Sequence, residues 1–393
     1  MSFDGLGVPA VQGDTAPRAH RWHRVDRPDR LRGPRSQVPV PVEILAVATA
    51  TPARKGNQQE LARHVCSMRP EFAEWEDLFT RSGIETRYLS VPVEWYEVAH
   101  SWAERMDLHR DHSLDLFGKI VPQLLEQSGL TLEDIDALVL NTTAGISVPT
   151  LDALLINRLG MRRNVKRLPI YGLGCSGGLA GLVHGSYLAR ALPGSRVLVL
   201  TVDLCSLAIR PDDRRLVNFV ATALFGDGAA GLIVQTPAVS SEVAAHVDRP
   251  ACLPRVLAAG EHLWEGTEGV LALSMTDDGF QMDLGRQLPE LIRNGFATAL
   301  NAFLDEVQIT RDDLDGFLVH GGGPKILDGV AQALGLPPQA LARSREVMRD
   351  FGNMSSATIL FTLERAVEAG VRGRHLLVAF GFGVSAHFAV VDL

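Results

Sequence analysis

The chain has 393 residues, of which 46% are hydrophobic, and its formal net charge at pH 7 is -8. This length and composition allow either two ordinary domains or one large duplicated domain with a sizeable core. The mildly acidic charge, with no long basic block beyond the N-terminus, speaks against a nucleic acid as partner. No apolar run reaches the ~20 residues that a membrane span requires, so no membrane span is expected.

The cysteine pattern also excludes some classes of site. Four cysteines are widely scattered, without a CxxC pair or clustered histidines, so the sequence indicates neither a disulfide framework nor a metal site. The N-terminus lacks the apolar core of a secretion signal. We therefore expect a protein of the reducing cytoplasm.

Residues 1–40 are rich in Pro, Gly and Arg, with seven arginines between Arg18 and Arg35 and no helical or strand periodicity. This composition predicts a flexible arm, since it offers too little apolar surface for a core. A basic arm could also touch an acidic surface or a partner. Ordered structure is expected to begin with the apolar run Val42–Ala48.

From that point, short apolar runs alternate with longer helical stretches. This alternation predicts an α/β protein. The predicted strands are 42–48, 137–140, 196–200, 231–234, 316–319 and 375–379, and the predicted helices are 113–128, 177–192, 288–307 and 355–369.

The sequence contains an internal echo. "LTLEDIDALVLNTTAG" from Leu130 matches "ITRDDLDGFLVHGGGP" from Ile309, at an offset of 179 residues. The same offset carries Cys175 to Met354, inside a second glycine-bearing turn that precedes a small-residue helix. Such a repeat predicts two copies of one α/β unit, assigned here to residues 41–236 and 237–393, with a site shared between them.

The stretch "YGLGCSGGLA" places Cys175 among glycines at the start of a predicted helix. Glycine permits a sharp turn and close backbone approach, and the positive end of a helix dipole is expected to lower the thiol pKa. Cys175 is therefore a candidate nucleophile. The alternative is a packed free cysteine, which is common in protein cores.

Two residues of the second copy could act with this cysteine. His320 ends a buried-type strand, and Asn353 lies in the turn equivalent to that of Cys175. Each could instead be structural, because strand-end histidines are often satisfied in the core and asparagine often caps a helix. Together with Cys175 they form a workable acyl-transfer set, in which His and Asn stabilise negative charge on a thioester oxygen.

At this point the sequence resembles the type III polyketide synthases, the chalcone synthase-like branch of the thiolase superfamily, over nearly all of residues 41–393. The matching stretches are "GCSGG", "LFGDGAAGLIV" from Leu224, "HGGGPKILD" from His320, "SREVMRDFGNMSSA" from Ser344 and "FGFG" from Phe380. The resemblance implies a layered αβαβα thiolase fold, a homodimer, and no cofactor beyond coenzyme A thioesters as substrates.

The resemblance also implies roles for particular residues. Cys175, His320 and Asn353 match the family's catalytic triad, and Phe225 matches a gatekeeper between the coenzyme A tunnel and the cavity. Cys175 would hold an acyl group from acyl-CoA, which malonyl-CoA then extends by decarboxylative condensation. The other positions expected to line the cavity are Thr143, Ala144, Val148, Cys205, Ala208, Met282, Ser355 and Phe382.

Small or flexible residues at these positions favour a long fatty acyl starter and an alkylresorcinol or alkylpyrone product. The main alternative is a synthase that uses malonyl-CoA alone and makes tetrahydroxynaphthalene or phloroglucinol. Each substitution can also be read as ordinary core packing. The family's "GFGPG" loop is here Gly381-Phe-Gly-Val-Ser385, which leaves the mode of cyclisation open.

Two cationic residues are candidates for binding the phosphates of coenzyme A, namely Arg87 in "GIETRY" and Lys325 in "GGGPKILD". Either could instead be a solvated surface charge. The rival functions are a ketoacyl-ACP synthase III, which would perform a single condensation, and a catalytically silent binding protein of the same fold.

Overall fold

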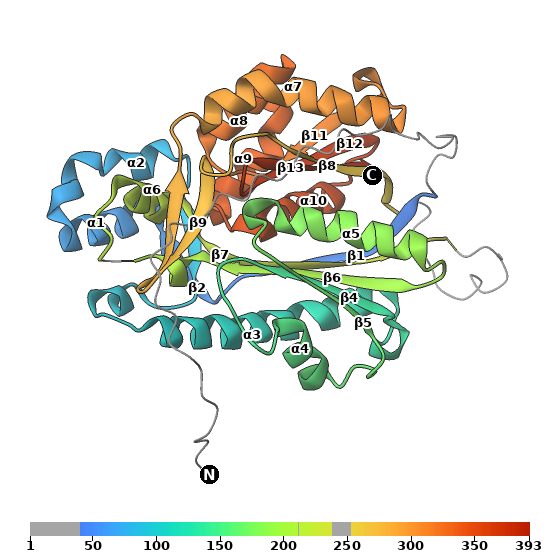
Figure 1. Ribbon diagram of the computed structural model, residues 1–393, viewed down its shortest axis with the longest axis horizontal. Helices are drawn as coiled ribbons and strands as arrows, with labels where there is room; N and C mark the ends of the chain where they lie inside the picture. Colours follow the sequence, from blue (N-terminus) through green and yellow to red (C-terminus); the bar gives the residue numbers. More distant parts are fainter. Residues whose placement is uncertain (1–39, 211, 238–252) are drawn as a thin grey trace, which may run out of the picture. The chain divides into compact units, whose positions relative to one another are not determined.

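The computed structural model describes residues 40–210, 212–237 and 253–393 (Figure 1). Except for its last residue, the arm expected at residues 1–40 lies outside these ranges. One mixed sheet organises the described part, with its strands in the order β11-β12-β13-β8-β1-β7-β6-β4-β5.

The first half of the chain supplies one end of this sheet. β4 is parallel to both β5 and β6, and β7 runs antiparallel between β6 and β1. Alternate residues of β6 enter different cores, because successive side chains of a strand point to opposite faces. The strands are β1 (Val42–Ala50), β4 (Ala137–Thr142), β5 (Lys166–Tyr171), β6 (Arg196–Leu204) and β7 (Asp227–Gln235).

The second half repeats this arrangement. β11 is parallel to β12, and β13 runs antiparallel between β12 and β8, so β8, β13, β12 and β11 correspond to β1, β7, β6 and β4. The two halves join where β1 pairs with β8. These strands are β8 (Arg255–Leu263), β11 (Gly316–Val319), β12 (Arg374–Gly381) and β13 (Ser385–Asp392). The duplication expected from the sequence echo is therefore confirmed.

Local structure repeats as well. Thr131 and Asp134 form a capping box before β4, and Thr310 and Asp313 form the same box before β11. In each box the aspartate accepts hydrogen bonds from the backbone N–H and the hydroxyl of its threonine. The two equivalent sequence stretches thus form equivalent turns.

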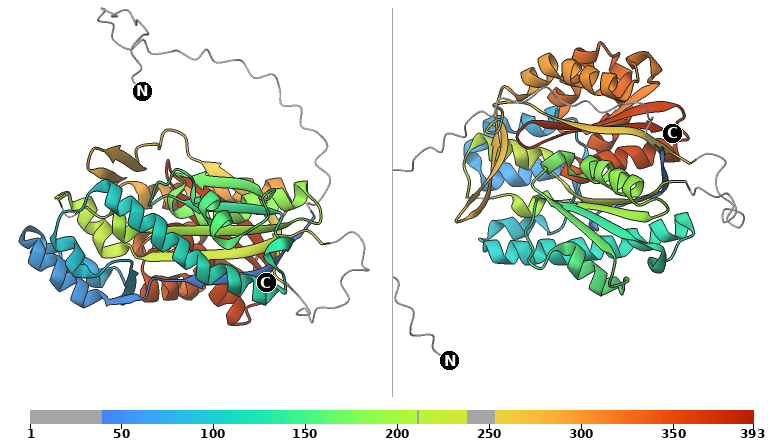
Figure 2. Two further views of the ribbon diagram at one scale, coloured as in Figure 1. Left: turned by 90° about the horizontal axis from the view of Figure 1, so that it is seen from below. Right: turned by 45° about the vertical axis from the view of Figure 1, so that its right-hand side comes forward.

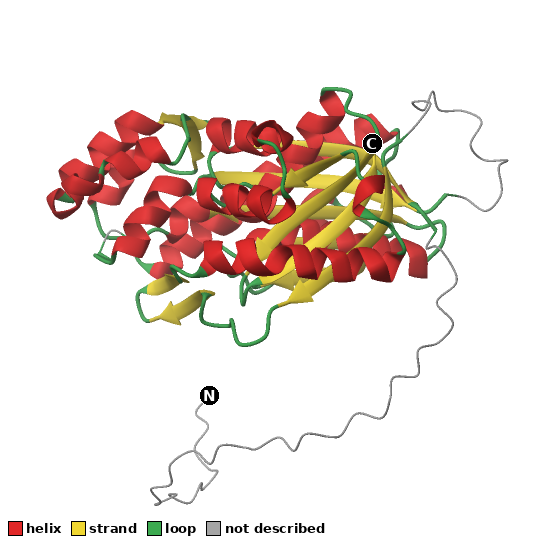
Figure 3. Ribbon diagram, turned by 90° about the horizontal axis from the view of Figure 1, so that it is seen from above, coloured by secondary structure: helices red, strands yellow, loops and turns green. Residues whose placement is uncertain are grey.

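Helices cover the sheet in layers, which confirms the predicted αβαβα thiolase architecture. In Figure 1, α3 (Trp102–Ser128) and α4 (Leu151–Leu159) lie below the first half's strands, and α7 (Leu288–Val307) and α8 (Pro324–Leu334) lie above those of the second half. Between them lie α5 (Gly177–Ala191) and α10 (Thr358–Glu368). Figure 2 shows the α3 face from below, and Figure 3 shows helices over strands from above.

Three hydrophobic cores correspond to these layers. The first lies around α5 and α10 and includes strand residues from both halves. The second lies between α3 and the sheet, and the third lies between the sheet and helices α7 and α8. The central layer is apolar because it is buried on both sides, which explains the small and aliphatic residues of α5. No helix in the described ranges has the length and apolar character needed to cross a membrane.

The remaining elements were only partly predicted. α3 begins eleven residues before the expected helix, because Ser101 caps its N-terminus by accepting a hydrogen bond from the Glu104 N–H. Two small two-stranded sheets, formed by β2 with β3 and by β9 with β10, were not predicted. The further elements are β2 (Arg54–Asn57), β3 (Thr86–Leu89), β9 (Leu271–Thr276), β10 (Gly279–Leu284), α1 (Gln58–Met68), α2 (Asp77–Arg81), α6 (Leu216–Leu224) and α9 (Ala342–Phe351).

A half-buried carboxyl in the central layer predicts a pH dependence of stability. The Thr49 hydroxyl donates a 2.5 Å hydrogen bond to Glu364 on α10, and burial raises the pKa of Glu364 to about 7. The protonated Glu364 side chain therefore stabilises the folded chain. This contribution to the free energy of unfolding is complete below its ordinary pKa of 4.5 and is lost as pH rises through about 7.

Between these two pH values the wild-type chain should therefore lose up to about 3 kcal/mol of unfolding free energy through this group. Glu364→Gln should remove that part of the decline. Urea unfolding of both proteins from pH 5 to pH 8 measures it, and parallel curves for the two proteins would contradict the prediction.

Candidate functional site

Cys175 lies in a tight turn between β5 and α5. A single 3-10 turn, Gly174–Ser176, leads directly into α5. Gly174 has φ +58°, and a Cβ atom there would lie 2.9 Å from the ring of Phe382. A Cβ at Gly178 would lie 2.1 Å from the carbonyl oxygen of Ser356. Glycine is therefore required where this turn meets the second half of the chain.

The turn of Asn353 faces that of Cys175, as the duplication predicted. The sulfur of Cys175 lies 3.9 Å from Oδ1 and 4.0 Å from Nδ2 of Asn353. Oδ1 also accepts a 2.8 Å hydrogen bond from the N–H of Ser355, which fixes the orientation of the amide. The backbone of Asn353 is held by Leu224 and Gly226, next to Phe225.

His320 is connected to this pair through its loop. Its backbone N–H donates to the carbonyl of Val378 at 2.8 Å, which extends the pairing of β11 with β12 by one residue. Nδ2 of Asn353 donates a 3.3 Å hydrogen bond to the carbonyl of Gly322, two residues beyond His320. The His320 side chain is 1% exposed, and neither ring nitrogen has a hydrogen-bond partner among the described residues.

The protonation of these side chains differs from the sequence-based expectation. Burial raises the pKa of Cys175 to about 11, although hydrogen bonds from Ser355 and Asn353 oppose the shift. Burial lowers the pKa of His320 to about 3. The prediction that the helix terminus lowers the thiol pKa is therefore wrong, because desolvation of the thiolate is the larger effect. At pH 7 the structure holds a neutral thiol and a neutral imidazole.

A buried carboxylate on β6, Asp203, connects the two turns. One oxygen accepts hydrogen bonds from the N–H groups of Thr143 and Ala144, at 2.7 and 2.8 Å. The other accepts from the N–H and the hydroxyl of Ser356, at 3.2 and 2.6 Å. The hydroxyl of Thr143 in turn accepts a 3.1 Å bond from the N–H of Gly174. Asp203 thus positions backbone on both sides of the nucleophile.

Replacing Asp203 by asparagine should lower the unfolding free energy by about 2–5 kcal/mol. The amide would turn an NH₂ group toward N–H or hydroxyl donors and leave them without an acceptor. Urea unfolding measures the loss. An exposed aspartate whose carboxylate accepts no hydrogen bond in the described ranges, Asp312→Asn, serves as the control, and equal stability of the two variants would count against the role of Asp203.

Four of the predicted cavity residues lie next to the two turns, namely Thr143, Phe225, Ser355 and Phe382. Thr143, Ala144 and Ser355 are buried, whereas Cys205, Ala208, Phe225, Met282 and Phe382 are half-buried. Cys205 follows β6 directly, and burial raises its pKa well above the usual value, with further contributions from Asp203, Asp227 and Cys175. Val148 differs from the rest, since it is 91% exposed.

The interpretation of Arg87 as a coenzyme A ligand is contradicted by its position. Arg87 is 3% exposed, and its guanidinium donates to the carbonyls of Thr222 and Phe225, at 2.5 and 2.7 Å. Burial lowers the pKa of this guanidinium to about 10. The Arg87 side chain thus holds the backbone of Phe225 in place. It does not reach the surface, where a coenzyme A phosphate would lie.

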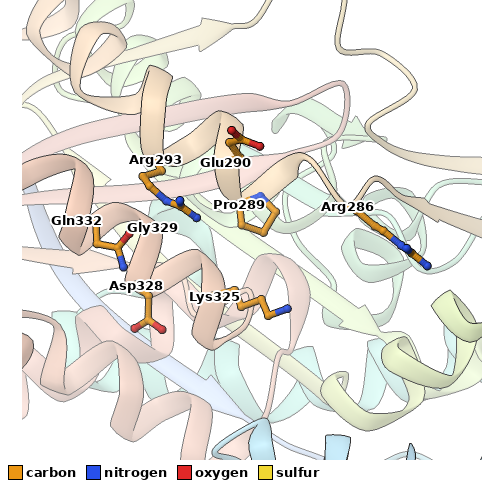
Figure 4. Close-up of a pocket in the computed structure, with 8 residues that line it drawn as sticks. All are labelled: Arg286, Pro289, Glu290, Arg293, Lys325, Asp328, Gly329 and Gln332. Carbon is orange, nitrogen blue, oxygen red and sulfur yellow. The ribbon is translucent and has the colours of Figure 1, made fainter.

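Lys325 occupies a position that does suit an anion. It is exposed on α8, five residues after His320, beside a pocket formed with α7 (Figure 4). Two arginines and two acidic residues share this pocket, and one acid, Asp328, already pairs with Arg345 at 2.7 Å. The lining residues are Arg286, Pro289, Glu290, Arg293, Lys325, Asp328, Gly329 and Gln332.

Sequence reasoning missed the two buried carboxylates at the site. Asp227 resembles Asp203 in accepting four hydrogen bonds, from the N–H and hydroxyl groups of Ser90 and Ser206. Both aspartates interrupt apolar strand runs, at the end of "VLVLTVD" and the start of "DGAAGLIV". That interruption was the available signal, since a charge inside a buried strand requires compensating donors.

Comparison with known proteins identifies the family of this chain. The family model "Chalcone and stilbene synthases, N-terminal domain" matches residues 35–237, and the corresponding C-terminal model matches residues 255–390. A 1,3,6,8-tetrahydroxynaphthalene synthase of Streptomyces peucetius subsp. caesius is 34% identical over 359 residues, which cover 88% of this chain and 92% of that protein.

Two further comparisons extend this result. A 3,5-dihydroxyphenylacetyl-CoA synthase of Streptomyces toyocaensis is 29% identical over 89% of both chains. The crystal structure of 1,3,6,8-tetrahydroxynaphthalene synthase from Streptomyces coelicolor A3(2), described as a bacterial type III polyketide synthase, superposes with a TM-score of 0.81 at 25% identity. That match covers 89% of this chain and 99% of the other. The chain thus belongs to the chalcone and stilbene synthase family, and it is an acyltransferase of the type III polyketide synthase class.

Proposed function

We propose that Cys175, His320 and Asn353 are the catalytic residues, and that the enzyme extends an acyl group on Cys175 by decarboxylative condensation with malonyl-CoA. The observation that carries this proposal is the approach of the Cys175 sulfur to within 4.0 Å of the Asn353 amide, where the turns of the two halves meet. A neutral His320 without a hydrogen-bond partner in the described ranges belongs to the same loop system.

In the first step, Cys175 takes an acyl group from its coenzyme A thioester. Because the thiol is protonated, its proton must leave as the sulfur attacks, and the neutral imidazole of His320 is the available base. The proton then returns to the coenzyme A thiolate that departs. An acyl thioester on Cys175 and free coenzyme A remain.

In the second step, malonyl-CoA loses carbon dioxide and leaves an enolate, whose oxygen needs hydrogen-bond donors. Nδ2 of Asn353 and a ring N–H of His320 are the proposed donors. The enolate carbon attacks the acyl thioester, and the Cys175 sulfur leaves. Transfer of the lengthened chain back to Cys175 permits another round, and cyclisation ends the sequence.

The identity of the starter is the second part of the proposal, and two alternatives have support. A long fatty acyl starter, giving an alkylresorcinol or alkylpyrone, is supported by the small or flexible residues Ala144, Ala208 and Met282 at expected cavity positions. The alternative, a synthase that makes tetrahydroxynaphthalene from malonyl-CoA alone, is supported by the similarity to the 1,3,6,8-tetrahydroxynaphthalene synthase of Streptomyces peucetius and by the half-buried Cys205 beside the site. We favour the tetrahydroxynaphthalene type over the fatty acyl type, because similar proteins support it.

Product analysis separates these alternatives. Purified enzyme would be incubated with malonyl-CoA alone and with malonyl-CoA plus short, aromatic or long-chain acyl-CoAs, followed by mass spectrometry. A pentaketide from malonyl-CoA alone supports the tetrahydroxynaphthalene type, and alkylated products that appear only with a long starter support the fatty acyl type. A single two-carbon extension in every reaction, as expected of a ketoacyl-ACP synthase III, would contradict iterative condensation.

We further propose that Lys325, with Arg286 and Arg293 across the pocket, attracts the phosphates of acyl-CoA and malonyl-CoA, and that no other cofactor takes part. The three cations lie against two acids, one of which is paired elsewhere, and this favours anion binding. Lys325→Ala should then raise the KM for malonyl-CoA and leave kcat unchanged.

A homodimer is also part of the proposal. Val148 is 91% exposed and Tyr171, at the end of edge strand β5, is 51% exposed, which is unusual for large apolar side chains on a free surface. Light scattering of the purified protein would test the assembly, and a mass of 42.6 kDa, that of a single chain, would contradict it.

A further inference from the structure

Three side chains far apart in the sequence converge beside α5. His184 lies on α5, Glu261 on β8 and His387 on β13. Their ligand atoms all lie within 4.8 Å of one another. We propose that these residues bind a divalent transition-metal ion, with Zn²⁺ as the best match, at a site that plays no part in the condensation chemistry.

The ligand set fits this ion. Two imidazoles and one carboxylate are a common ligand set for Zn²⁺, which binds nitrogen and oxygen at about 2.0–2.2 Å. Nε2 of His387 already lies 3.2 Å from Oε2 of Glu261, close to the separation of two ligands in a tetrahedral site. A change of side-chain torsion in His184, which is only half-buried, would bring the third ligand closer.

His387 is the strongest indication of a ligand. It is 1% exposed, its Nδ1 has no hydrogen-bond partner in the described ranges, and its Nε2 faces only the Glu261 carboxylate, at 3.2 Å and without hydrogen-bond geometry. A buried imidazole that lacks a well-formed hydrogen bond is costly, and coordination of a metal would lower that cost.

The backbone around the cluster is fixed before any ion binds. His387 and Glu261 are directly paired residues of the antiparallel strands β13 and β8. The hydroxyl of Tyr187, one helical turn after His184, donates a 3.1 Å hydrogen bond to the carbonyl of Ala259 on β8. Ligands on regular elements keep their geometry better than ligands on loops. The Glu261 carboxylate is 63% exposed, which leaves a path for the ion to enter.

The position of the cluster gives the ion a structural role. α5 begins two residues after Cys175, and His184 lies farther along the same helix. A bound ion would fasten this helix of the first half to two strands of the second half. No motif in the sequence indicates this site, because its three residues are widely separated.

Zinc binding by the untagged full-length protein tests the proposal. Chelator-treated enzyme would be titrated with Zn²⁺ in competition with a chelating dye. We expect one high-affinity ion per chain in the wild type, and a loss of affinity of at least about 100-fold in both His184→Ala and Glu261→Gln, since each removes a direct ligand. Both residues are partly or largely exposed, so both variants should fold.

His262→Ala is the matched control. His262 neighbours Glu261 on β8 but packs its ring on Trp264, so this variant should keep the wild-type affinity. In thermal unfolding, free Zn²⁺ at 100 times its Kd should raise the wild-type Tm by about 3 °C and leave that of Glu261→Gln unchanged.

Two results would overturn the proposal. One is the absence of bound zinc in the wild-type protein. The other is equal affinity in the wild type, His184→Ala and Glu261→Gln, which would place the ion elsewhere, for example at Cys175 and Cys205. Substitution by Co²⁺ distinguishes these places, because thiolate ligands give an intense near-ultraviolet charge-transfer band that a site of two histidines and a carboxylate lacks.

Discussion

Replacing Cys175 by alanine is expected to lower product formation at least about 1000-fold, because no other group can hold the growing chain as a thioester. Intact-mass spectrometry after incubation with an acyl-CoA measures the cause directly. The wild-type chain should gain the mass of one acyl group, and Cys175→Ala should gain none. Product formation, measured in parallel, should disappear together with the adduct.

Two other cysteines supply the comparison. Cys66→Ser alters a half-buried thiol on α1, away from the site, and should keep both the adduct and the activity. Cys205→Ala should also keep the adduct, since Cys205 lies in the turn after β6, whereas the sulfur that faces the Asn353 amide is that of Cys175. An acyl adduct that persists in Cys175→Ala and disappears in Cys205→Ala would contradict the proposal, because it would identify Cys205 as the nucleophile.

The fold was predictable because the chain repeats itself. Thr131 and Thr310 begin equivalent capping boxes, and each box leads into an equivalent strand. Short apolar runs gave the centres of β1, β4, β6, β7, β11 and β12 correctly, since strands buried on both faces are apolar throughout. β5, β8 and β13 of the same sheet were not predicted. The ends of elements were less predictable. The start of α3 depends on a cap at Ser101, ahead of the apolar stretch that signals the helix.

The meeting of Cys175 with Asn353 was also predictable, because the offset of the repeat places their turns at equivalent positions. The environment of each group was not. Arg87 looks in the sequence like a surface cation, but two carbonyls at 2.5 and 2.7 Å hold it in the interior. The pKa of Cys175 depends on how much water the folded chain excludes from the thiol. A local sequence pattern does not predict that burial.

Asn353 offers the sharpest test of the decarboxylation step. In Asn353→Asp, one carboxylate oxygen can still accept the hydrogen bond from Ser355, but the donor represented by Nδ2 is lost. The new oxygen would lie near the sulfur of Cys175 and the carbonyl of Gly322, where it would repel a developing enolate. We expect the release of carbon dioxide from malonyl-CoA to fall by 10²–10³-fold, the usual effect of removing one oxyanion donor.

Asn353→Ala separates the loss of the donor from the addition of a charge. If donation by Nδ2 stabilises the enolate, the alanine variant should lose decarboxylation by a similar factor, and acyl loading on Cys175 should persist because that step needs only the thiol and a base. Wild-type decarboxylation in Asn353→Ala would show that the defect of the aspartate variant comes from its charge. The enolate would then have to be stabilised by His320 without help from the amide.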